Sequence, residues 1–294
     1  MTKPRLAISF SGGESSAVMS MWCYLLYGDT HDIRATFVNT GCEHEETLRF
    51  VRDCDTHIFK GTLDWIEAVT NGPRKGPTAV KVTYETASRN GEPFEAAIRK
   101  HGVFGPTHPQ CTSRLKTEPM LWWRKQNGWP PKTYDTAVGI RADEIDRVSA
   151  QRERDRIVYP LIQAGFTKQH VNDIMSELPW RLRLPGEHYG NCTWCWKKSK
   201  RKLLTLAKDS PEVFDFPKRM EAQYGHTDVA GTGGGKHRTF FRGNLSACDL
   251  IQLANTTQFD PYVPKQTETM FDPSFDPNLD VGGGCGESCE IGAD

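Results

Sequence analysis

The first 60 residues alternate between short apolar runs and amphipathic stretches, and this rhythm constrains the fold more than any other feature of the chain. Residues 5–10 (RLAISF) and 33–40 (IRATFVNT) are apolar runs that indicate buried strands. Residues 14–28 place apolar side chains at helical spacing, and residues 43–55 indicate a second helix with acidic residues in its first turn, where the helix dipole favours them. Strands that alternate with helices at this interval predict an α/β fold with a parallel sheet and crossover helices.

The rest of the chain is less regular. A third strand is expected to begin at 57–59, a further strand is expected over 132–139, and residues 71–93, rich in Gly, Pro, Thr and Lys, indicate a long active-site loop. The part beyond residue 225 carries glycine runs and Asp-Pro pairs, which predict an irregular tail with one short helix. Helices are expected over 112–127, 168–178, 199–208, 211–224 and 245–254.

The charge balance argues against binding by bulk charge. Lys and Arg number 37 and Asp and Glu also number 37, so the formal net charge is zero, which disfavours nucleic acid and anionic membranes as bulk partners while leaving room for a local patch. The sequence has no run of about 18 apolar residues and no signal-peptide pattern. We therefore expect a cytoplasmic protein with no membrane partner, whose nine cysteines are reduced, so that clustered ones suggest metal or redox chemistry.

The segment between the first predicted strand and helix is a candidate phosphate loop. Its glycines let the backbone approach an anion, and the N–H groups that open the helix point towards it. A tight turn is the alternative, but the loop falls at the carboxyl end of a strand, where α/β sheets bind ligands. It matches neither the P-loop nor the dinucleotide motif, and its missing lysine argues against an ordinary kinase or GTPase. The candidate residues are Ser11, Gly12, Gly13, Glu14, Ser15 and Ser16.

This loop resembles the pyrophosphate loop of the adenine-nucleotide α-hydrolase-like superfamily, which includes ATP pyrophosphatases and phosphoadenosine phosphosulfate (PAPS) reductases. Over about residues 6–205 the chain is similar to the PAPS reductase family, especially to its phage-borne and DNA-phosphorothioation-like members. One departure is Glu14, where pyrophosphatases usually carry Asp or Lys. The segments that carry the resemblance beyond the loop are Phe37–Thr47 (FVNTGCEHEET), Cys111–Lys116 (CTSRLK), Gly139–Glu144 (GIRADE) and Tyr159–Leu161 (YPL).

The resemblance implies a Rossmann-like (HUP-type) parallel sheet with flanking helices. It implies a nucleotide-binding domain over 1–165, followed over 166–294 by a helical and irregular C-terminal region that completes a cysteine site. The expected ligand is an adenine nucleotide, either ATP with Mg²⁺ or adenosine phosphosulfate (APS) or PAPS. A homo-oligomer is compatible with the sequence.

The resemblance also implies a set of charged residues around the nucleotide. Arginine can clamp a phosphate chain bidentately and lysine can neutralise it, although most such residues are solvated surface charges. Arg114 and Arg141 are expected to face the nucleotide, with Lys116 as a further candidate. Asp143 and Glu144 are expected either to hold Mg²⁺ or to orient Arg141. The nucleotide-binding residues expected outside the loop are Asn39, Glu43, Gly139, Arg141 and Asp143.

Lys197–Lys202 contains five cations in six residues. Such a run is usually a solvated helix face, which we favour. The alternative is a patch that attracts a nucleic-acid acceptor or an acidic protein partner.

The cysteines suggest a metal or cluster site. Cys192 and Cys195 form a C-x-x-C chelate, which can grip one metal or act as a redox dithiol. Cys111 lies upstream at a separation similar to that in cluster-bearing sulfonucleotide reductases, and the tail residue Cys285 or Cys289 is expected to supply the fourth ligand. The resemblance favours [4Fe–4S], with Zn²⁺ as the alternative to it, and unrelated reduced thiols as the alternative to both.

The remaining cysteines are expected to be structural. Cys23, Cys54 and Cys248 fall within helical patterns and are predicted to lie in the core, and Cys42 is assigned no role.

The resemblance leaves three functional hypotheses. In the favoured one, a substrate oxygen attacks the α-phosphorus of ATP, pyrophosphate leaves, and a sulfur donor then displaces the adenylated oxygen. In the second, the thiolate of Cys285 attacks the sulfur of APS or PAPS, and thioredoxin resolves the intermediate to release sulfite. The intact loop favours the first, since only that reaction has a pyrophosphate leaving group. The third hypothesis is a nucleotide-binding regulator without turnover.

Overall fold

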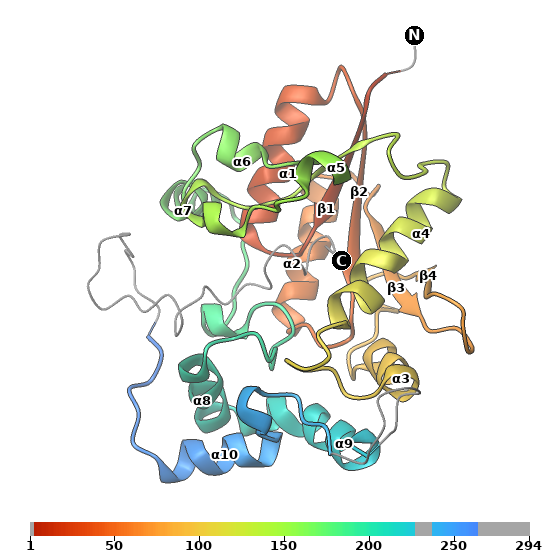
Figure 1. Ribbon diagram of the computed structural model, residues 1–294. Coiled ribbons are helices and arrows are strands. Elements are labelled where there is room, and N and C mark those ends of the chain that lie inside the picture. Colours follow the sequence, from red (N-terminus) through yellow and green to blue (C-terminus); the bar gives the residue numbers. More distant parts are fainter. Residues whose placement is uncertain (1–2, 227–236, 264–294) are drawn as a thin grey trace.

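Six strands form one sheet in the computed structural model, which describes residues 3–226 and 237–263 (Figure 1). Their order across the sheet is β4-β3-β2-β1-β5-β6, with β4 antiparallel to β3 and the other neighbours parallel. The predicted α/β class, a parallel sheet with flanking helices, is therefore confirmed. The strands are β1 (Arg5–Phe10), β2 (Asp32–Asn39), β3 (Asp64–Val69), β4 (Thr78–Lys81), β5 (Asp135–Ala137) and β6 (Ile157–Val158).

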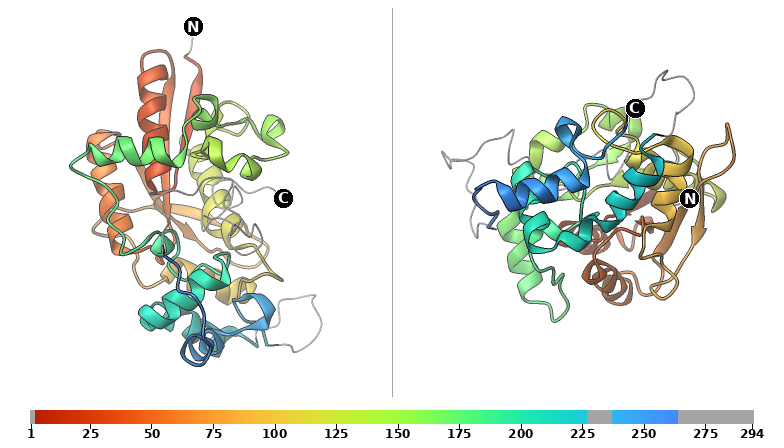
Figure 2. Two further views of the ribbon diagram at one scale, coloured as in Figure 1. Left: turned by 90° about the vertical axis from the view of Figure 1, so that its left-hand side faces the viewer. Right: turned by 90° about the horizontal axis from the view of Figure 1, so that it is seen from below.

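Strand β1 is central, and its side chains alternate between two packed faces. Leu6, Ile8 and Phe10 pack with helices α1 and α2, while Ala7 points to the opposite face and packs with Trp129. Helix α4 covers that second face over β3 and β4, and Figure 2 shows helices on both sides of the sheet. Both faces are thus buried, which explains why the parallel strands are near-continuous apolar runs.

The helices agree closely with the sequence pattern where the pattern is long. Those expected over 14–28, 43–55, 168–178, 199–208 and 245–254 are present, with bounds shifted by no more than two residues at either end. The helix expected over 211–224 begins with a 3₁₀ turn. The helices are α1 (Glu14–Tyr27), α2 (Glu45–His57), α3 (Glu92–His101), α4 (Glu118–Gln126), α5 (Arg152–Asp155), α6 (Pro160–Gln163), α7 (Lys168–Ser176), α8 (Lys200–Asp209), α9 (Asp215–Tyr224) and α10 (Ala247–Thr256).

Three predictions about local structure were wrong. The third strand begins at Asp64 rather than at 57–59, because α2 continues to His57 and the chain turns through Gly61 at a φ of 77° before entering the sheet. The predicted loop 71–93 contains the edge strand β4 and leads into α3, which was not predicted. The strand expected over 132–139 is only the three residues of β5.

The helix expected over 112–127 starts with a π-helical turn, Ser113–Thr117, before α4. Pro119 has no N–H to donate to the carbonyl of Leu115, so a regular α-helical ladder cannot run through this point. The amide of Glu118 instead bonds to the carbonyl of Ser113, five residues back.

Helices α8, α9 and α10 gather with α3 beyond the carboxyl ends of the parallel strands (Figure 1). Their shared core is aromatic: Trp194 contacts Phe94 on α3, and Phe216 and Phe240 from the C-terminal part. This layer faces the sheet edge where parallel α/β sheets bind ligands. None of the helices in the described ranges is both long and apolar enough to cross a membrane.

Candidate nucleotide and cysteine sites

The loop Ser11–Ser16 joins the carboxyl end of β1 to the start of α1, in the place predicted for it. Gly12 has a φ of 79°, and a Cβ there would lie 2.9 Å from Cγ2 of Val51, so the backbone geometry requires glycine. Gly13 precedes α1 without capping it through a side chain. The first amides of α1 therefore have no side-chain acceptor from their cap residue and can receive an anion.

The three serines of the loop have different roles. Ser16 donates to the carbonyl of Gly13 at 2.8 Å, and Ser11 donates to the hydroxyl of Ser16 at 3.1 Å, so these two hold the loop in shape. The hydroxyl of Ser15 instead accepts a hydrogen bond from Nη1 of Arg141 at 3.0 Å. Gly139, just before Arg141, allows this approach, because a Cβ there would lie 3.0 Å from Cα of Ser16.

Arg141 is fixed by carboxylates on its own turn. Its Nε lies 3.0 Å from Oδ1 of Asp143, and its Nη2 lies 3.3 Å from Oε1 of Glu144. Glu144 also pairs with Arg147. The structure thus shows both acidic residues in contact with Arg141, which is the orienting role of the two anticipated for them, and Mg²⁺ binding stays a prediction.

Glu14 pairs with a residue that the sequence pattern did not single out. Oε1 of Glu14 lies 3.4 Å from Nε of Arg181, which belongs to the segment between α7 and α8. Burial raises the pKa of Glu14, while the charge of Arg181 and the backbone amide of Leu182 oppose that rise. No motif marks Arg181, so only the fold could have identified it.

The residues expected on the adenosine side are engaged by the protein. Asn39, buried at the end of β2, donates to Oε1 of Glu67 at 2.6 Å and to the carbonyl of Ser88 at 2.9 Å. The carboxylate of Glu43 accepts from the amide and hydroxyl of Thr40, each at 2.9 Å. These contacts order the turn after β2, and direct binding of a nucleoside by Asn39 or Glu43 stays a prediction.

The structure separates Arg114 from Lys116. Nη1 of Arg114 lies 2.7 Å from Oε1 of Glu118, and Nε of Arg114 donates to Gln110, with no contact to the loop among the described residues. Lys116 points inward, with its Nζ 3.9 Å from Glu43. Burial works against its charge, but the surrounding cysteines and Glu43 outweigh burial and raise the pKa of Lys116.

Three of the predicted thiol ligands meet at one small cavity of about 20 Å³. Cys111, Cys192 and Cys195 line it together with Lys116, Thr40, Thr112 and apolar side chains. Burial raises the pKa of Cys111 and raises that of Cys192 to about 12. Within the described ranges no three or more His, Cys, Asp or Glu side chains are arranged to hold a metal ion. Cys285 and Cys289 lie outside the described residues.

A fourth thiol, to which the sequence assigned no role, lies beside this cavity. The carbonyl of Cys42 accepts from the amide of Thr193 at 3.1 Å, and Glu43 forms an antiparallel bridge with Cys192. Burial raises the pKa of the Cys42 thiol, and the nearby Cys192 and Glu43 add to the rise. The turn after β2 therefore joins the carboxyl ends of the parallel strands to the C-x-x-C segment.

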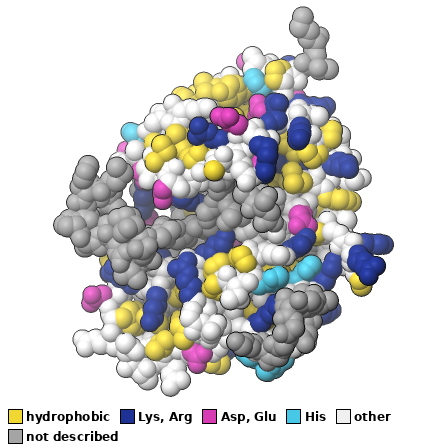
Figure 3. Space-filling view, in the orientation of Figure 1, with side chains coloured by type: hydrophobic (Ala, Val, Ile, Leu, Met, Phe, Trp, Pro, Cys, Tyr) yellow, Lys and Arg dark blue, Asp and Glu magenta, His cyan; other side chains and the backbone are white. Residues whose placement is uncertain are grey.

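Two predictions about surface residues were wrong. The run Lys197–Lys202 is not a solvated face, because Lys198 and Lys202 are buried, with Nζ of Lys198 donating to the carbonyl of Gly190 at 2.7 Å. The run therefore gives less support to the binding of a nucleic-acid acceptor. On the face shown in Figure 3, Lys and Arg side chains are spread among other side chains. Cys248, expected in the core, is exposed on α10.

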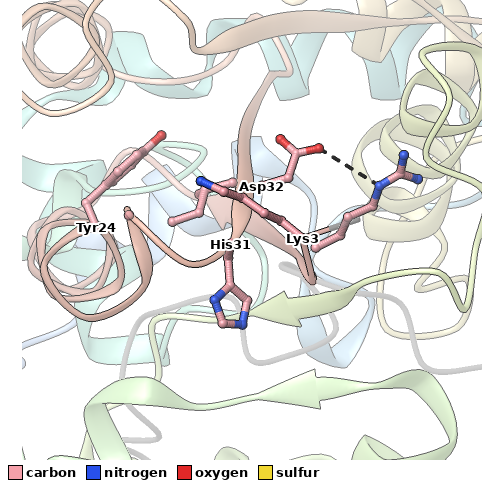
Figure 4. A pocket seen from close by; sticks show the side chains of 7 residues that line it. Lys3, Tyr24, His31 and Asp32 are labelled. Atoms are coloured by element: carbon pink, nitrogen blue, oxygen red, sulfur yellow. Dashed lines mark ion pairs between the residues drawn. The ribbon is translucent and has the colours of Figure 1, made fainter. Parts of the chain in front are cut away.

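A hollow of about 530 Å³ lies at the opposite end of the strands, beside the amino ends of β1 and β2 (Figure 4). Lys3, Arg5, Tyr24, His31 and Asp32 are among its lining residues, and an ion pair of 3.9 Å joins Arg5 to Asp32. None of the residues predicted for the nucleotide or cysteine sites lines this hollow.

No protein-family model matches the chain. It is 28% identical over 293 residues to an uncharacterized nin region protein, ORF290, of Escherichia phage lambda, across 97% of this chain and 94% of the phage protein. It is also similar to the crystal structure of a phosphoadenylyl-sulfate (PAPS) reductase from Candida auris in its phosphate complex. That likeness has a TM-score of 0.34 and 17% identity, and it covers 62% of this chain and 76% of the reductase chain.

Proposed function

We propose that this protein binds an adenine nucleotide at the loop Ser11–Ser16 and activates a substrate with ATP, releasing pyrophosphate. The observation that supports this most directly is the combination of open amides at the start of α1 with the guanidinium of Arg141 on Ser15. Both lie at the carboxyl end of parallel strands. Together they offer backbone donors and a fixed cation for a phosphate chain.

In the proposed reaction a substrate oxygen attacks the α-phosphorus of ATP and the bond to the β-phosphate oxygen breaks. Pyrophosphate leaves into the loop, where the amides of α1 and the hydroxyl of Ser15 bind its developing charge. Arg141, held in place by Asp143 and Glu144, stabilises the charge on the α-phosphate of the transferred adenylyl group. A sulfur nucleophile then displaces the adenylated oxygen, releasing AMP. Mg²⁺ accompanies ATP and shields its phosphates.

We further propose that the cysteine cavity holds an iron–sulfur cluster, with zinc as the alternative. The donor set fits in kind, since thiolates bind both, and Lys116 and Lys198 supply cations that would balance the charge of several thiolates. Cys111, Cys192 and Cys195 would be three ligands, and Cys285 or Cys289 the fourth. Such a group would supply electron transfer or sulfur handling near the nucleotide.

The second candidate function is reduction of APS or PAPS. It is favoured by the position of the cysteine cavity, which lies at the same sheet edge as the loop, where a sulfonucleotide would present its sulfate. Here the thiolate of Cys285 would attack the sulfate sulfur and break its bond to the phosphate oxygen, so that AMP leaves from APS or adenosine 3′,5′-bisphosphate leaves from PAPS. Thioredoxin would then reduce the S-sulfocysteine, which releases sulfite and leaves thioredoxin as its disulfide.

Incubating anaerobically purified protein separately with ATP and with PAPS tests both candidates. Release of pyrophosphate and AMP from ATP is the expected result, and thiol-dependent sulfite from PAPS would favour reduction instead. Arg141→Lys should lower turnover roughly 10-fold or more, because a point charge does not reproduce a planar fork held by two carboxylates. The matched control is Arg154→Lys, since Arg154 is an exposed arginine paired only to its neighbour Asp155 in the described part of the chain. Turnover of neither nucleotide would contradict an enzymatic role.

A further inference from the structure

The loop contains a negative charge that no other residue of the loop balances. Its only charged side chain is Glu14, whose carboxylate opens α1 at the place where an anion is proposed to bind. Two negative groups this close repel each other unless a cation lies between them. Arg141 is already shared between Asp143 and Glu144. A cation beside Glu14 would balance this carboxylate next to the phosphate chain, in addition to the Mg²⁺ and the Arg141 of the proposed reaction.

Arg181 is the cation that the fold brings to Glu14. Its Nε lies 3.4 Å from Oε1 of Glu14, and the backbone amide of Leu182 also bonds to the Glu14 carboxylate. These two contacts hold the segment between α7 and α8 against the phosphate loop. They join residues 167 and 168 positions apart in the sequence, so they arise from tertiary packing.

The pair is not built as a stabilising salt bridge would be. Oε1 of Glu14 is buried, and its contact with Nε of Arg181, at 3.4 Å, is long for a charge-assisted hydrogen bond. A well-formed pair would be bidentate. The side chain of Arg181 is 41% exposed, and within the described ranges Glu14 is its one partner, which leaves its two Nη groups open to a ligand.

We propose that Arg181 binds the phosphate chain of the nucleotide, and that Glu14 is the positioning residue that keeps its guanidinium at the loop. This inference rests on the proposed nucleotide site. Arg141 from the turn after β5 and Arg181 from the segment after α7 then approach adjacent residues of the loop, Ser15 and Glu14. Glu14, at which the loop departs from the usual sequence, thus positions a cation that comes from elsewhere in the chain.

The test is the affinity of the full chain for ATP, AMP and adenosine, measured by calorimetry. Arg181→Ala should weaken ATP binding by roughly 10-fold or more, because a charge-assisted bidentate contact is lost. The affinity for adenosine, which has no phosphate, should not change. Arg181→Lys should recover only part of the loss. Arg183→Ala is the matched control: Arg183 is an exposed arginine two residues along the same segment, and its loss should change ATP affinity less than twofold.

The double variant Glu14→Gln/Arg181→Ala separates contact from simple neutralisation. If Arg181 contacts phosphate, removing the Glu14 charge restores at most part of the affinity for ATP. Full recovery would mean that Arg181 only neutralises Glu14 and would overturn the inference. Equal ATP affinity in Arg181→Ala and wild type would also overturn it, while leaving the nucleotide site standing. Failure of the wild type to bind ATP would refute both. Thermal unfolding of each variant confirms that it is folded.

Discussion

The candidate phosphate loop and the cysteine cavity both lie at the carboxyl ends of the parallel strands, but they are built in opposite ways. The loop is six consecutive residues whose geometry follows from Gly12 and from hydrogen bonds among its own serines. The cavity is assembled from the π-helical turn, the segment after β2 and the C-x-x-C segment. The loop is polar and half-buried, with Gly12 and Ser16 buried. The cavity is enclosed, and the lining side chains other than its cysteines are apolar except for Lys116 and two threonines. A contiguous motif can therefore be recognised from sequence, whereas a dispersed one depends on the fold.

The largest effect expected from this contrast is on Gly13. Gly13→Val should abolish nucleotide binding, because a branched side chain would stand between the first amides of α1 and the anion. Stability should stay close to that of the wild type, since Gly13 has a φ of −106° and a Cβ there would meet only Oγ of Ser11, at 3.7 Å.

Gly12→Val is the matched comparison and should fail differently. Its Cβ would lie 2.9 Å from Val51 at a positive φ, so the fold itself should be destabilised by about 1–3 kcal/mol. Chemical denaturation with nucleotide titration distinguishes the two variants. Wild-type ATP affinity in Gly13→Val would contradict the loop assignment.

A smaller set of changes is expected at the cavity. If it holds a cluster, anaerobic protein should be brown, with absorbance near ~400 nm from thiolate-to-iron charge transfer. Cys192→Ser should lose the colour and the bound iron, while Cys248→Ser, which alters an exposed thiol, should keep both. One zinc per chain in colourless wild-type protein would indicate the alternative metal. Protein free of metal, with all thiols titratable under native conditions, would contradict both.

The two sites can also be tested for independence. Because the loop and the cavity share the turn after β2, Cys192→Ser should lower ATP affinity modestly, by roughly twofold to fivefold, whereas Gly13→Val should not change the metal content. Metal loss in Gly13→Val would show that the two regions fold as one unit rather than as neighbours.

The smallest expected effect concerns Arg114, whose side chain, among the described residues, contacts neither the candidate phosphate loop nor the cysteine cavity. Burial, with the charge of Arg114 as the next cause, lowers the pKa of His101 to about 4. In the unfolded chain this histidine binds a proton near its ordinary pKa of about 6.5, whereas in the folded chain it stays neutral down to about pH 4. The contribution of His101 to the free energy of unfolding therefore falls as the pH decreases from about 6.5 to 4. Arg114→Met should raise the pKa of His101 and flatten that fall, measured by NMR titration and by denaturation at pH 5 and pH 7. An unchanged His101 pKa would contradict this placement of Arg114.

The sequence predicted what local chemistry determines. The first two strands and helices follow from apolar spacing, and the loop follows from two adjacent glycines before a helix. Strand β4 was missed because a half-exposed strand of four residues gives a weak periodic signal. Helix α3 was missed because Gly91 and Pro93, which lie at its start, indicate a loop in the sequence. The third strand was placed too early because Ile58 and Phe59 are apolar, yet they pack in the core just after α2 rather than in the sheet.

The site residues that sequence placed incorrectly, or did not find, all depend on tertiary packing. Lys198 is buried because its amine reaches the carbonyl of Gly190, and no pattern in a run of cations shows which of them turns inward. Cys42 lies beside Cys192 only because the turn after β2 pairs with the C-x-x-C segment. Arg181 meets Glu14 through the path of the chain after α7.

The π-helical turn Ser113–Thr117 amounts to one extra residue accommodated inside a helix. Each residue of an α-helix advances the direction of its side chains by about 100°. Deleting a single residue from this turn would rotate everything before the deletion relative to α4. Cys111 would then turn away from Cys192 and Cys195 while the core under α4 stayed in place. The length of this turn therefore sets the direction in which Cys111 points relative to α4. Insertions or deletions here should be far less tolerated than substitutions on the exposed side of α4.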